Sequence, residues 1–437
     1  MSSESTLSLR SFVSLVRGTT YKGELVGQPG PVLLGLASIQ PDGGFRRGSF
    51  KTYGGESPAK ITLGPGDVYV SLKDVTQSGD LLGSVARVPR DIAAGRLTQD
   101  TVKLQFDGRP ISQRYVYWLL RTPAYRAYCR SHATGTTTLG LARDDFLDFP
   151  APAPSNADLS LVDLLEALDD RITLLRETNA TLEAIAQALF KSWFVDFDPV
   201  RAKSQGLAPA GMDEATAALF SERFEVSALG PIPAGWRVLP FTDAATVIGG
   251  GTPKTSSPEY WDGQIPWFSV VDAPSGADTF VVSTEKTLTP IGLANCSAKL
   301  LPVGTTIISA RGTVGRLALV GREMAMNQSC YALRGKAGDA YFTYFSTRGL
   351  VSTLKQRTHG SVFDTITRDT LAGVLIVYPP ELVISAFEAV VDSLMSRIRE
   401  NLLQSRTLSA LRDTLLPRLI SGQLGLPETI ADVDETA

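Results

Sequence analysis

The sequence predicts an α+β protein: two tandem mixed α/β domains separated by two long helices that form an antiparallel coiled coil. Three observations predict this arrangement: the length of the chain, an internal repeat and two apolar helical seams. With 437 residues the chain is too long for one ordinary domain. Its 43% hydrophobic and 20% charged residues are typical of a globular protein with a sizeable core.

Five pairs of segments match one another in the same order along the two halves of the chain. The pairs are 16–22 with 248–254, 63–74 with 301–312, 115–132 with 341–359, 135–154 with 360–380, and 169–193 with 395–419. One example sets LGPGDVYVSLKD over LPVGTTIISARG, and another sets VRGTTYK over IGGGTPK. The separation between partners stays roughly constant, so we infer an internal pseudo-two-fold repeat.

Each repeat consists of a mixed part followed by a long helical part. Short β-rich runs bounded by Gly and Pro, such as 67–72 and 305–310, predict strands in the mixed parts. The predicted layout is a first domain at 1–155, a central long helix at 156–199, a linker at 200–236, a second domain at 237–380 and a C-terminal long helix at 381–423. We expect the acidic residues 424–437 to be disordered.

Both helical parts carry apolar residues at spacings of three and four, with polar breaks. The first seam contains Leu161, Leu165, Leu168, Ile172, Leu175, Leu182, Ile185, Leu189 and Trp193. The second contains Phe387, Leu394, Ile398, Leu408, Leu411, Leu415 and Leu419. Asn179 interrupts the first, and Asn401 and Ser405 interrupt the second. A lone polar residue in such a seam fixes the register of pairing, and two seams in one chain invite pairing with each other.

The composition argues against catalysis and against a metal site. Only two histidines are available, and the three cysteines are far apart, which favours a reducing compartment and disfavours a disulfide framework or a zinc site. No window reaches the length of a transmembrane helix, and the first residues lack the pattern of a signal peptide. We therefore expect a cytoplasmic protein.

The segments that could suggest an active site have other interpretations. GGGTPKTS (249–256) resembles a phosphate loop, but Pro253 precedes Lys254 and removes a backbone amide that such a loop needs. The carboxylate pairs at 144–145 and at 196 and 198 suggest a helix start and a helix stop. Motifs of a methyltransferase or a nuclease are not found. The sequence thus predicts a binding protein or a scaffold without catalytic residues.

The net charge of −3 hides an alternation along the chain. Residues 1–150 carry 18 Lys and Arg against 13 Asp and Glu, and residues 237–379 carry 13 against 10. The remaining segments hold 11 against 22. Both mixed domains are therefore basic. Two basic domains on one helical frame would each bind one half-site of a DNA target. Because the domains differ in sequence, the target would be bipartite and asymmetric.

The candidate DNA contacts are cationic or hydroxyl residues in Gly-rich loops after β-rich runs, where backbone can approach phosphate. They are Lys73 in the first domain and Arg311, Thr313 and Arg316 in the second, with Arg46, Arg47 and Lys51 in GGFRRGSFK as further candidates. Ser361 and the repeat-related Arg143 and Arg368 are weaker candidates. For each, a solvated positive surface is the alternative interpretation.

Several motifs resemble the specificity (S) subunit of type I restriction–modification systems. They are ALFKSWFVDFDPV (188–200), SARGTVGRLALV (309–320), THGSVFDTITRDTL (358–371) and LLPRLISGQL (415–424). The resemblance implies two target-recognition domains and no catalysis in this chain. It implies two methyltransferase (modification) subunits that use S-adenosylmethionine, and a restriction/translocase subunit that uses ATP and Mg. The first domain departs from the second at one aligned segment of the repeat: residues 73–75 are KDV, whereas residues 311–313 are RGT.

The aromatic residues Phe190, Trp193, Phe194 and Phe197 gather where the first long helix is expected to end at Pro199. They could form a docking patch for a modification subunit, or they could pack the helix end against a recognition domain. Two other functions stay open for the chain: a non-catalytic coiled-coil adapter that binds only proteins, and an orphan DNA-binding relative without a restriction partner. A self-contained methyltransferase or nuclease would require motifs that the sequence lacks.

Overall fold

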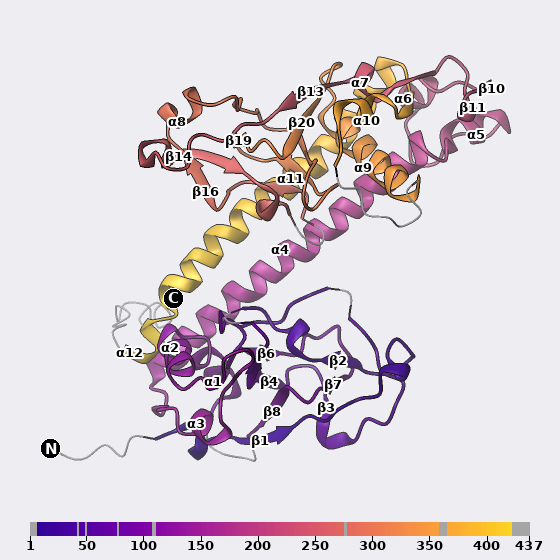
Figure 1. Cartoon of the computed structure of the whole chain (residues 1–437). Coiled ribbons are helices and arrows are strands. Elements are labelled where there is room, and N and C mark those ends of the chain that lie inside the picture. Colours follow the sequence, from indigo (N-terminus) through magenta and orange to yellow (C-terminus); the bar gives the residue numbers. More distant parts are fainter. Residues whose placement is uncertain are drawn as a thin grey trace, which may run out of the picture. The chain divides into compact units, whose positions relative to one another are not determined.

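The computed structural model describes residues 7–41, 43–48, 50–76, 78–106, 111–274, 278–357 and 365–421. The chain divides into two units, the first built from residues 1–172 and 407–437 and the second from residues 173–406. Two long helices, α4 (Asn156–Phe194) and α11 (Glu381–Leu415), contribute residues to both units (Figure 1). Ser361 and the predicted tail at 424–437 lie outside the described residues.

Unit 1 is built on an antiparallel four-stranded sheet in the order β1-β8-β4-β6. Its strands are β1 (Ser14–Arg17), β4 (Val68–Ser71), β6 (Val85–Arg87) and β8 (Thr101–Gln105). Strand β4 is buried on both faces because its side chains alternate between two cores. Val68 and Val70 join a core with helices α1 and α2, whereas Tyr69 joins a second core with the small sheet of this unit.

The rest of unit 1 covers these two faces. The small sheet has the order β2-β7-β3, and the pair β5-β9 lies apart from it. The bounds are β2 (Val32–Leu34), β3 (Thr62–Leu63), β5 (Lys73–Asp74), β7 (Gly95–Leu97), β9 (Leu139–Gly140), α1 (Gln113–Leu119), α2 (Pro123–Ser131) and α3 (Arg143–Leu147). The 3₁₀ turns η1 to η4 are Leu9–Ser11, Gly23–Leu25, Leu36–Ser38 and Ala59–Ile61.

Unit 2 contains a five-stranded sheet in the order β13-β20-β17-β18-β15 and a three-stranded sheet in the order β16-β14-β19. The strands are β13 (Ala245–Gly249), β14 (Trp261–Phe268), β15 (Phe280–Val281), β16 (Lys286–Leu288), β17 (Thr306–Ser309), β18 (Leu317–Val320), β19 (Ala325–Met326) and β20 (Cys330–Gly335). Strand β17 repeats the pattern of β4, since Ile308 and Ile307 enter cores on opposite faces.

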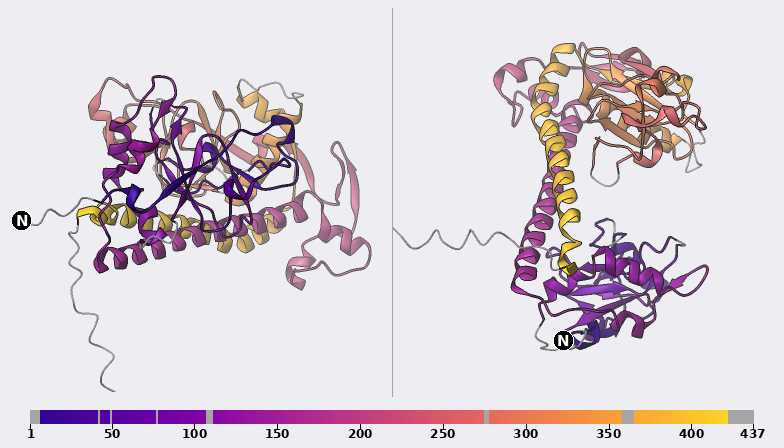
Figure 2. Two further views of the ribbon diagram at one scale, coloured as in Figure 1. Left: turned by 90° about the horizontal axis from the view of Figure 1, so that it is seen from below. Right: turned by 90° about the vertical axis from the view of Figure 1, so that its left-hand side faces the viewer.

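The remaining elements of unit 2 connect this sheet to the long helices. They are α5 (Asp198–Ser204), α6 (Glu214–Ala218), β10 (Phe224–Ser227), β11 (Gly230–Pro233), β12 (Arg237–Pro240), α7 (Phe241–Ala244), η5 (Pro258–Tyr260), η6 (Val270–Asp272), α8 (Pro290–Ala294), α9 (Ala340–Arg357), α10 (Arg368–Ala372) and β21 (Leu375–Tyr378). The helix α12 (Arg418–Ser421) belongs to unit 1. Two further views of the ribbon are given in Figure 2.

The main sheets of the two units repeat one another, as the sequence predicted. The order β1-β8-β4-β6 corresponds to β13-β20-β17-β18, with the same directions and the same sequence of strands along the chain. The hairpin after the central strand closes in the same way in both units. The backbone N–H of Gly83 donates to the carbonyl of Ser71 at 2.8 Å, and that of Gly315 donates to the carbonyl of Ser309 at 2.9 Å.

The loops that follow these central strands also pair with equivalent segments. Lys73 pairs with Gly140 in unit 1, and Arg311 forms a bridge with Thr365 in unit 2. Both pairs lie in segments that the sequence had aligned. The first hairpin loop is longer than the second, which is the departure that the sequence indicated near residues 73–75.

Helices α4 and α11 pack against each other in antiparallel directions in each unit. In unit 2, Trp193 near the end of α4 contacts Phe387 near the start of α11. Asn179, earlier in α4, donates to the carbonyl of Ile398 at 3.1 Å, later in α11. In unit 1, the guanidinium of Arg412 donates to Asp169 at 2.8 Å. The antiparallel pairing of the two seams is thereby confirmed.

Two residues assigned to the seams are outside them. Ile185 and Leu411 are 44% and 47% exposed, because a run of leucines and isoleucines offers more than one stripe at helical spacing. The residues that α11 buries in their place include Val391 and Met395, which the sequence analysis passed over.

The helix ends and the linker differ from the prediction. Helix α4 ends at Phe194, and the chain reverses at Phe197, whose left-handed backbone has a φ of 56°. Pro199 does not end α4 but lies in the first turn of α5, where its fixed φ is suitable. Helix α11 ends at Leu415 because Pro417 disfavours a helical residue before it. The segment 200–236, predicted as a linker, instead contains most of α5, all of α6 and the hairpin β10–β11.

Candidate nucleic-acid interface

Three loops of unit 2 leave the same end of its main sheet. The first follows β13 after Gly249, the second follows β17 after Ser309, and the third precedes Cys330, where β20 begins. In the ladders, Gly249 pairs with Tyr331 and Ser309 pairs with Cys330. Because β20 runs antiparallel to both neighbours, the loops 250–256, 310–316 and 327–329 meet at one edge of the sheet.

Unit 1 has the equivalent edge. Strand β1 ends there at Arg17, β4 ends there at Ser71, and β8 begins there at Thr101. Ser71 pairs with Thr101, and Arg17 pairs with Val102. The loops 18–22, 72–84 and 98–100 therefore gather at an edge that corresponds to the one in unit 2. Loop clusters on a rigid sheet are a common position for recognition residues.

The structure places two of the predicted contacts of unit 2 at this edge with exposed side chains. Arg311 and Thr313 lie in the loop after β17, and within the described residues the guanidinium of Arg311 has no ion-pair partner. Ser309 closes this loop, because its hydroxyl donates to the carbonyl of Thr313 at 2.5 Å. Arg316 lies in the same loop, but its guanidinium donates to the carbonyl of Pro274 at 3.0 Å.

The predicted contacts of unit 1 are divided between two places. Lys73 lies in the loop after β4, where it pairs with Asp100 at 3.1 Å. Arg46, Arg47 and Lys51 instead lie on the exposed segment beside β2. Arg47 pairs with Asp91 at 2.7 Å, whereas Arg46 and Lys51 have no ion-pair partner among the residues that the structure describes. The weaker candidates Arg143 and Arg368 each begin a short helix, α3 and α10.

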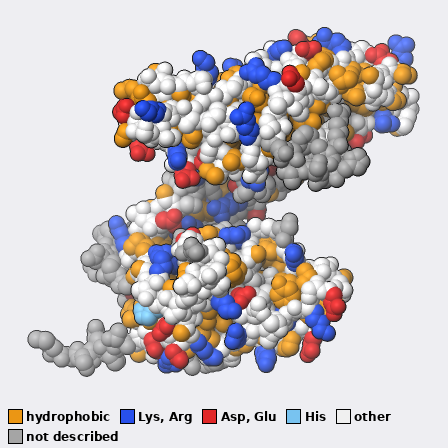
Figure 3. Space-filling model, viewed as in Figure 1, with side chains coloured by type: hydrophobic (Ala, Val, Ile, Leu, Met, Phe, Trp, Pro, Cys, Tyr) orange, Lys and Arg blue, Asp and Glu red, His pale blue; other side chains and the backbone are white. Residues whose placement is uncertain are grey.

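Basic and acidic side chains are interspersed over the surface of each unit on the face shown in Figure 3. The modest positive excess of each domain is therefore not concentrated in one large patch on this face. A phosphate backbone would be recognised by a few positioned cations at the loop edges.

The four aromatic residues near the end of α4 lie inside a hydrophobic core of unit 2. Trp193, Phe194 and Phe197 are 6%, 7% and 8% exposed, and Phe190 is half-buried. Phe194 stacks edge-to-face on Phe387 of α11 at a centroid distance of 5.0 Å. Of the two predicted roles, packing the helix end against a domain matches this arrangement. A docking patch would need its rings at the surface, but three of the four rings are buried.

Ion pairs connect the mixed domain of unit 1 to both long helices, and we call this contact the ionic joint of unit 1. Asp169 of α4 lies 2.8 Å from Arg412 of α11 and 3.6 Å from Arg121, which follows α1. Burial alone would raise the pKa of Asp169. The two guanidiniums lower this pKa by a larger amount, so it lies below its ordinary value. Nearby, Glu166 accepts from Arg87 at 2.9 Å and from the indole of Trp118 at 2.7 Å. These bonds satisfy charges that α4 buries against the domain.

The corresponding joint of unit 2 contains a carboxylate with a raised pKa. Glu388 of α11 accepts from the backbone N–H groups of Phe342 at 2.7 Å and Tyr341 at 3.0 Å, in the first turn of α9. Burial raises the pKa of Glu388 to about 7, against the lowering effect of these two bonds. Tyr341 also donates to Asp392 at 2.9 Å, so α9 is bound to α11 at two points.

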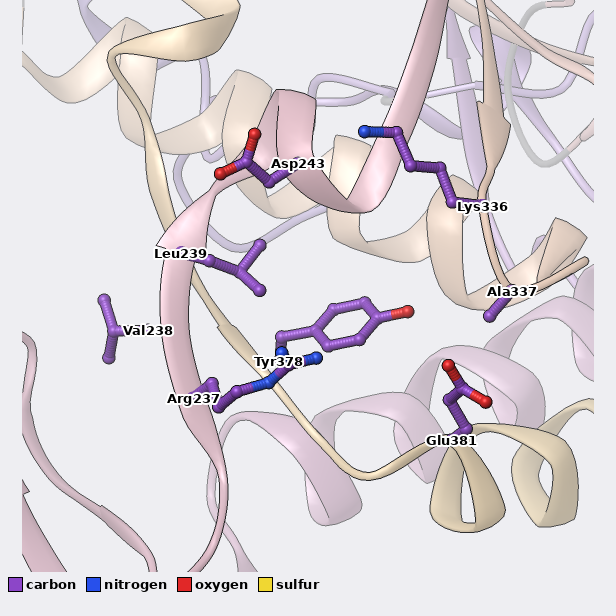
Figure 4. Close-up of a pocket in the computed structure, with 8 residues that line it drawn as sticks. All are labelled: Arg237, Val238, Leu239, Asp243, Lys336, Ala337, Tyr378 and Glu381. Atoms are coloured by element: carbon purple, nitrogen blue, oxygen red, sulfur yellow. The ribbon is translucent and has the colours of Figure 1, made fainter.

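The hollow shown in Figure 4, of about 470 Å³, lies at the opposite end of strand β20 from the candidate interface. Its lining includes two cations, Arg237 and Lys336, and two carboxylates, Asp243 and Glu381. Lys336 donates to the carbonyl of Thr242 at 3.0 Å. Because the two cations are matched by two carboxylates, and Lys336 is already hydrogen-bonded, this hollow has no preference for an anionic ligand.

Two further structural findings concern the described residues. They contain no group of three or more His, Cys, Asp and Glu side chains placed to hold a metal ion. None of their helices combines the length and apolarity that a bilayer crossing would require.

The sequence analysis missed several residues at the two loop edges, all exposed except the half-buried Thr252. They are Thr20, Lys22 and Gln99 in unit 1, and Thr252, Lys254 and Gln328 in unit 2. The available signal was the match of VRGTTYK with IGGGTPK, which placed Lys22 over Lys254. This match predicted only a repeat, because nothing in the sequence brought the glutamines next to it.

Comparisons with known proteins agree with this architecture. The family model described as the type I restriction modification DNA specificity domain matches residues 233–383. The HindI specificity subunit of a type I restriction enzyme from Haemophilus influenzae is 28% identical over 306 residues. That match covers 60% of this chain and 66% of the relative.

Two other similarities are informative. The MjaIX specificity subunit from Methanocaldococcus jannaschii is 31% identical over 159 residues, covering 36% of this chain and 37% of the relative. The crystal structure of the type I restriction–modification S subunit from M. genitalium has a TM-score of 0.54 at 15% identity and covers 94% of both chains, which supports the shared fold. With the repeated domains and the paired helices, these matches show that the chain is similar to specificity subunits of type I restriction–modification systems, and that residues 233–383 match their DNA specificity domain.

Proposed function

We propose that this chain is the sequence-reading subunit of a type I restriction–modification complex. Each unit would bind one half of an asymmetric, bipartite double-stranded DNA target. The paired helices α4 and α11 would belong to the frame that joins the two readers. The chain itself would carry no catalytic step.

The observation that carries this proposal is the repeated loop edge. In both units, three loops gather at the same end of an equivalent sheet. The loop after the central strand carries a cation at the equivalent position, Lys73 in unit 1 and Arg311 in unit 2. Two similar platforms with different loop sequences suit two different half-sites.

The proposed partners supply the chemistry. Two methyltransferase subunits with S-adenosylmethionine would modify the bound target, and a restriction/translocase subunit with ATP and Mg would act on unmodified DNA. The chain would direct these subunits to their site. The long helices offer exposed apolar residues, including Leu174 and Leu403, and we propose that the partners dock near them.

Duplex binding at different salt concentrations tests the DNA-reading role. Fluorescence anisotropy with the purified full chain and a mixed-sequence duplex should show an affinity that falls steeply as salt rises. Arg311→Ala should weaken this binding about 3- to 10-fold, as expected for the loss of one phosphate or base contact. Arg322→Ala is the matched control, because Arg322 is exposed at the opposite end of β18.

The alternative functions give other results in this assay. A coiled-coil adapter that binds only proteins would show no salt-dependent affinity for the duplex. Equal effects of Arg311→Ala and Arg322→Ala would contradict the assignment of the loop edge. An orphan DNA-binding relative would bind the duplex but would not support methylation when it is combined with the methyltransferase subunit.

A further inference from the structure

A close backbone approach is repeated at the loop edges of the two units. A Cβ placed on Gly18 would come within 2.0 Å of the carbonyl oxygen of Thr98. A Cβ placed on Gly250 would come within the same distance of the carbonyl oxygen of Asn327. In both units, therefore, the loop after the first strand lies directly on the segment that precedes the last strand. This contact fixes which residues of the two units correspond.

The correspondence sets one threonine and one glutamine at equivalent positions of the two units. Thr20 and Thr252 stand two residues after the two glycines, and Gln99 and Gln328 immediately follow the two contacted residues. Both glutamines are exposed. The sequences around them differ, yet the same pair of side-chain types occurs at the same place.

In unit 2 the pair is held by a hydrogen bond. The hydroxyl of Thr252 donates to the side-chain oxygen of Gln328. Because this bond occupies the oxygen end of the amide, the Nε2 end is directed away from Thr252, and within the described residues it has no hydrogen-bond partner. The side chain of Gln328 is thus a positioned donor at the surface.

A lysine completes each group. Lys22 and Lys254 follow the threonines by two residues, are exposed, and have no ion-pair partner in the described part of the chain. The loops that carry them are anchored: Arg96 donates to the carbonyl of Thr20 at 3.0 Å, and Trp267 donates to the carbonyl of Gly251 at 3.0 Å. An ammonium group on an anchored loop and an amide N–H₂ on the loop beside it are donors of the kind that bind an anion.

We propose that Lys22 with Gln99, and Lys254 with Gln328, form two equivalent clamps for DNA phosphate, one in each unit. The inference rests on the proposed function. Two half-sites of different sequence share the phosphate backbone, so side chains that are repeated at equivalent positions suit a contact common to both half-sites. Side chains that read bases are expected at positions where the units differ.

The test combines salt dependence with base preference, using the full chain and a mixed-sequence duplex library. Lys22→Ala and Lys254→Ala should each reduce the slope of log affinity against log salt concentration by about 0.9, the value for one phosphate contact. Lys254→Arg should restore the slope. Gln99→Ala and Gln328→Ala should weaken every duplex by the same factor and leave the selected sequences unchanged.

The controls separate this inference from the proposed function. Arg90→Ala and Arg322→Ala remove exposed arginines that lie at the opposite ends of the sheets, and they should leave the slope unchanged. Thermal unfolding of each variant checks that its fold is retained. If the wild-type chain binds duplex with a normal slope but the lysine variants match these controls, the clamps do not exist. A change of preference at a single base in Gln328→Ala would identify a base reader and overturn the phosphate assignment.

The wild-type chain itself provides the remaining outcome. If it shows no salt-dependent duplex affinity at all, then the proposed function fails and the clamps fail with it.

Discussion

The side-chain amide of Asn401 donates to the amide oxygen of Asn179 at 2.9 Å, inside the seam between α11 and α4. Both residues are almost fully buried. Asn179 also donates to the carbonyl of Ile398 at 3.1 Å, so the pair is satisfied within the seam. Each asparagine is a polar break in its own apolar repeat, and their contact aligns the two repeats in one antiparallel register.

Replacing one asparagine should cost more than replacing both. Asn179→Leu leaves the Asn401 amide buried without its partner, which should lower the free energy of unfolding by about 1–3 kcal/mol. The double variant Asn179→Leu/Asn401→Leu removes both polar groups and should recover much of that loss. Urea unfolding followed by circular dichroism gives the comparison. If the double variant is less stable than both single variants, the cost does not come from leaving one buried amide without its partner, and the prediction is wrong.

The ionic joint of unit 1 should depend strongly on Asp169. Asp169→Asn leaves the buried guanidinium of Arg121 without its counter-charge and weakens the bond to Arg412, so unfolding should become easier by about 2–4 kcal/mol. Asp170→Asn is the control, because Asp170 is exposed on the same turn. Equal urea midpoints for the two variants would contradict a structural role for this joint.

The stability of unit 2 should fall as the pH rises, because of Glu388. The pKa of this carboxyl is about 7 in the folded chain, above its ordinary value of 4.5. A raised pKa means that the contribution is complete below the unfolded value and is lost as the pH rises through about 7. The loss is at most about 3 kcal/mol for a shift of this size.

Glu388→Gln should remove this pH dependence, since the amide cannot ionise. The urea midpoint of the wild type should fall between pH 5 and pH 8, and that of Glu388→Gln should change less. Glu400→Gln, at an exposed position on the same helix, should behave like the wild type. A parallel decrease in all three proteins would assign the pH dependence to other groups.

The glycine at the loop edge of unit 2 should be intolerant of a side chain. Gly250→Ala would place a Cβ against the carbonyl oxygen of Asn327, so the two loops must separate. The neighbouring Gly249→Ala meets no atom within 4 Å and serves as the control. We expect Gly250→Ala to weaken duplex binding at least 10-fold and Gly249→Ala to retain it. Equal affinities would show that the close approach is unimportant for the interface.

The aromatic core at the end of α4 should be a stability determinant. Trp193→Ala removes a ring that packs on Phe220 and Phe387 and should cost about 3–5 kcal/mol. Val195→Ala, two residues away at an exposed position, should change stability by less than about 0.5 kcal/mol. A Trp193→Ala variant of unchanged stability would favour the docking interpretation instead.

The sequence was informative where periodicity and repetition are strong. Asn179 and Asn401 could be identified as polar breaks in the two apolar seams, although the sequence did not pair them, and the internal repeat aligned Ser71 with Ser309 before their hairpins were visible. The repeat also indicated that the first domain departs from the second near residues 73–75. These features depend on local patterns that are written directly in the chain.

Other features depend on contacts between distant segments. Nothing near Arg121 in the sequence indicates that it meets Asp169. The rings of Trp193 and Phe194 have the composition of a docking patch as well as of a core, and only packing against Phe387 distinguishes the two. Gln328 was missed for the same reason, because its partner Thr252 lies on another loop.

The most direct test of the proposed function is a map of methylated sites. The chain would be co-expressed with a methyltransferase (modification) subunit of a type I system, and modified positions in the host genome would be identified by single-molecule sequencing. The proposed function predicts one asymmetric motif made of two short half-sites with a fixed spacer, lost when either unit is disabled by Gly18→Ala or Gly250→Ala. A short continuous palindrome, or no methylation with an active methyltransferase, would contradict it.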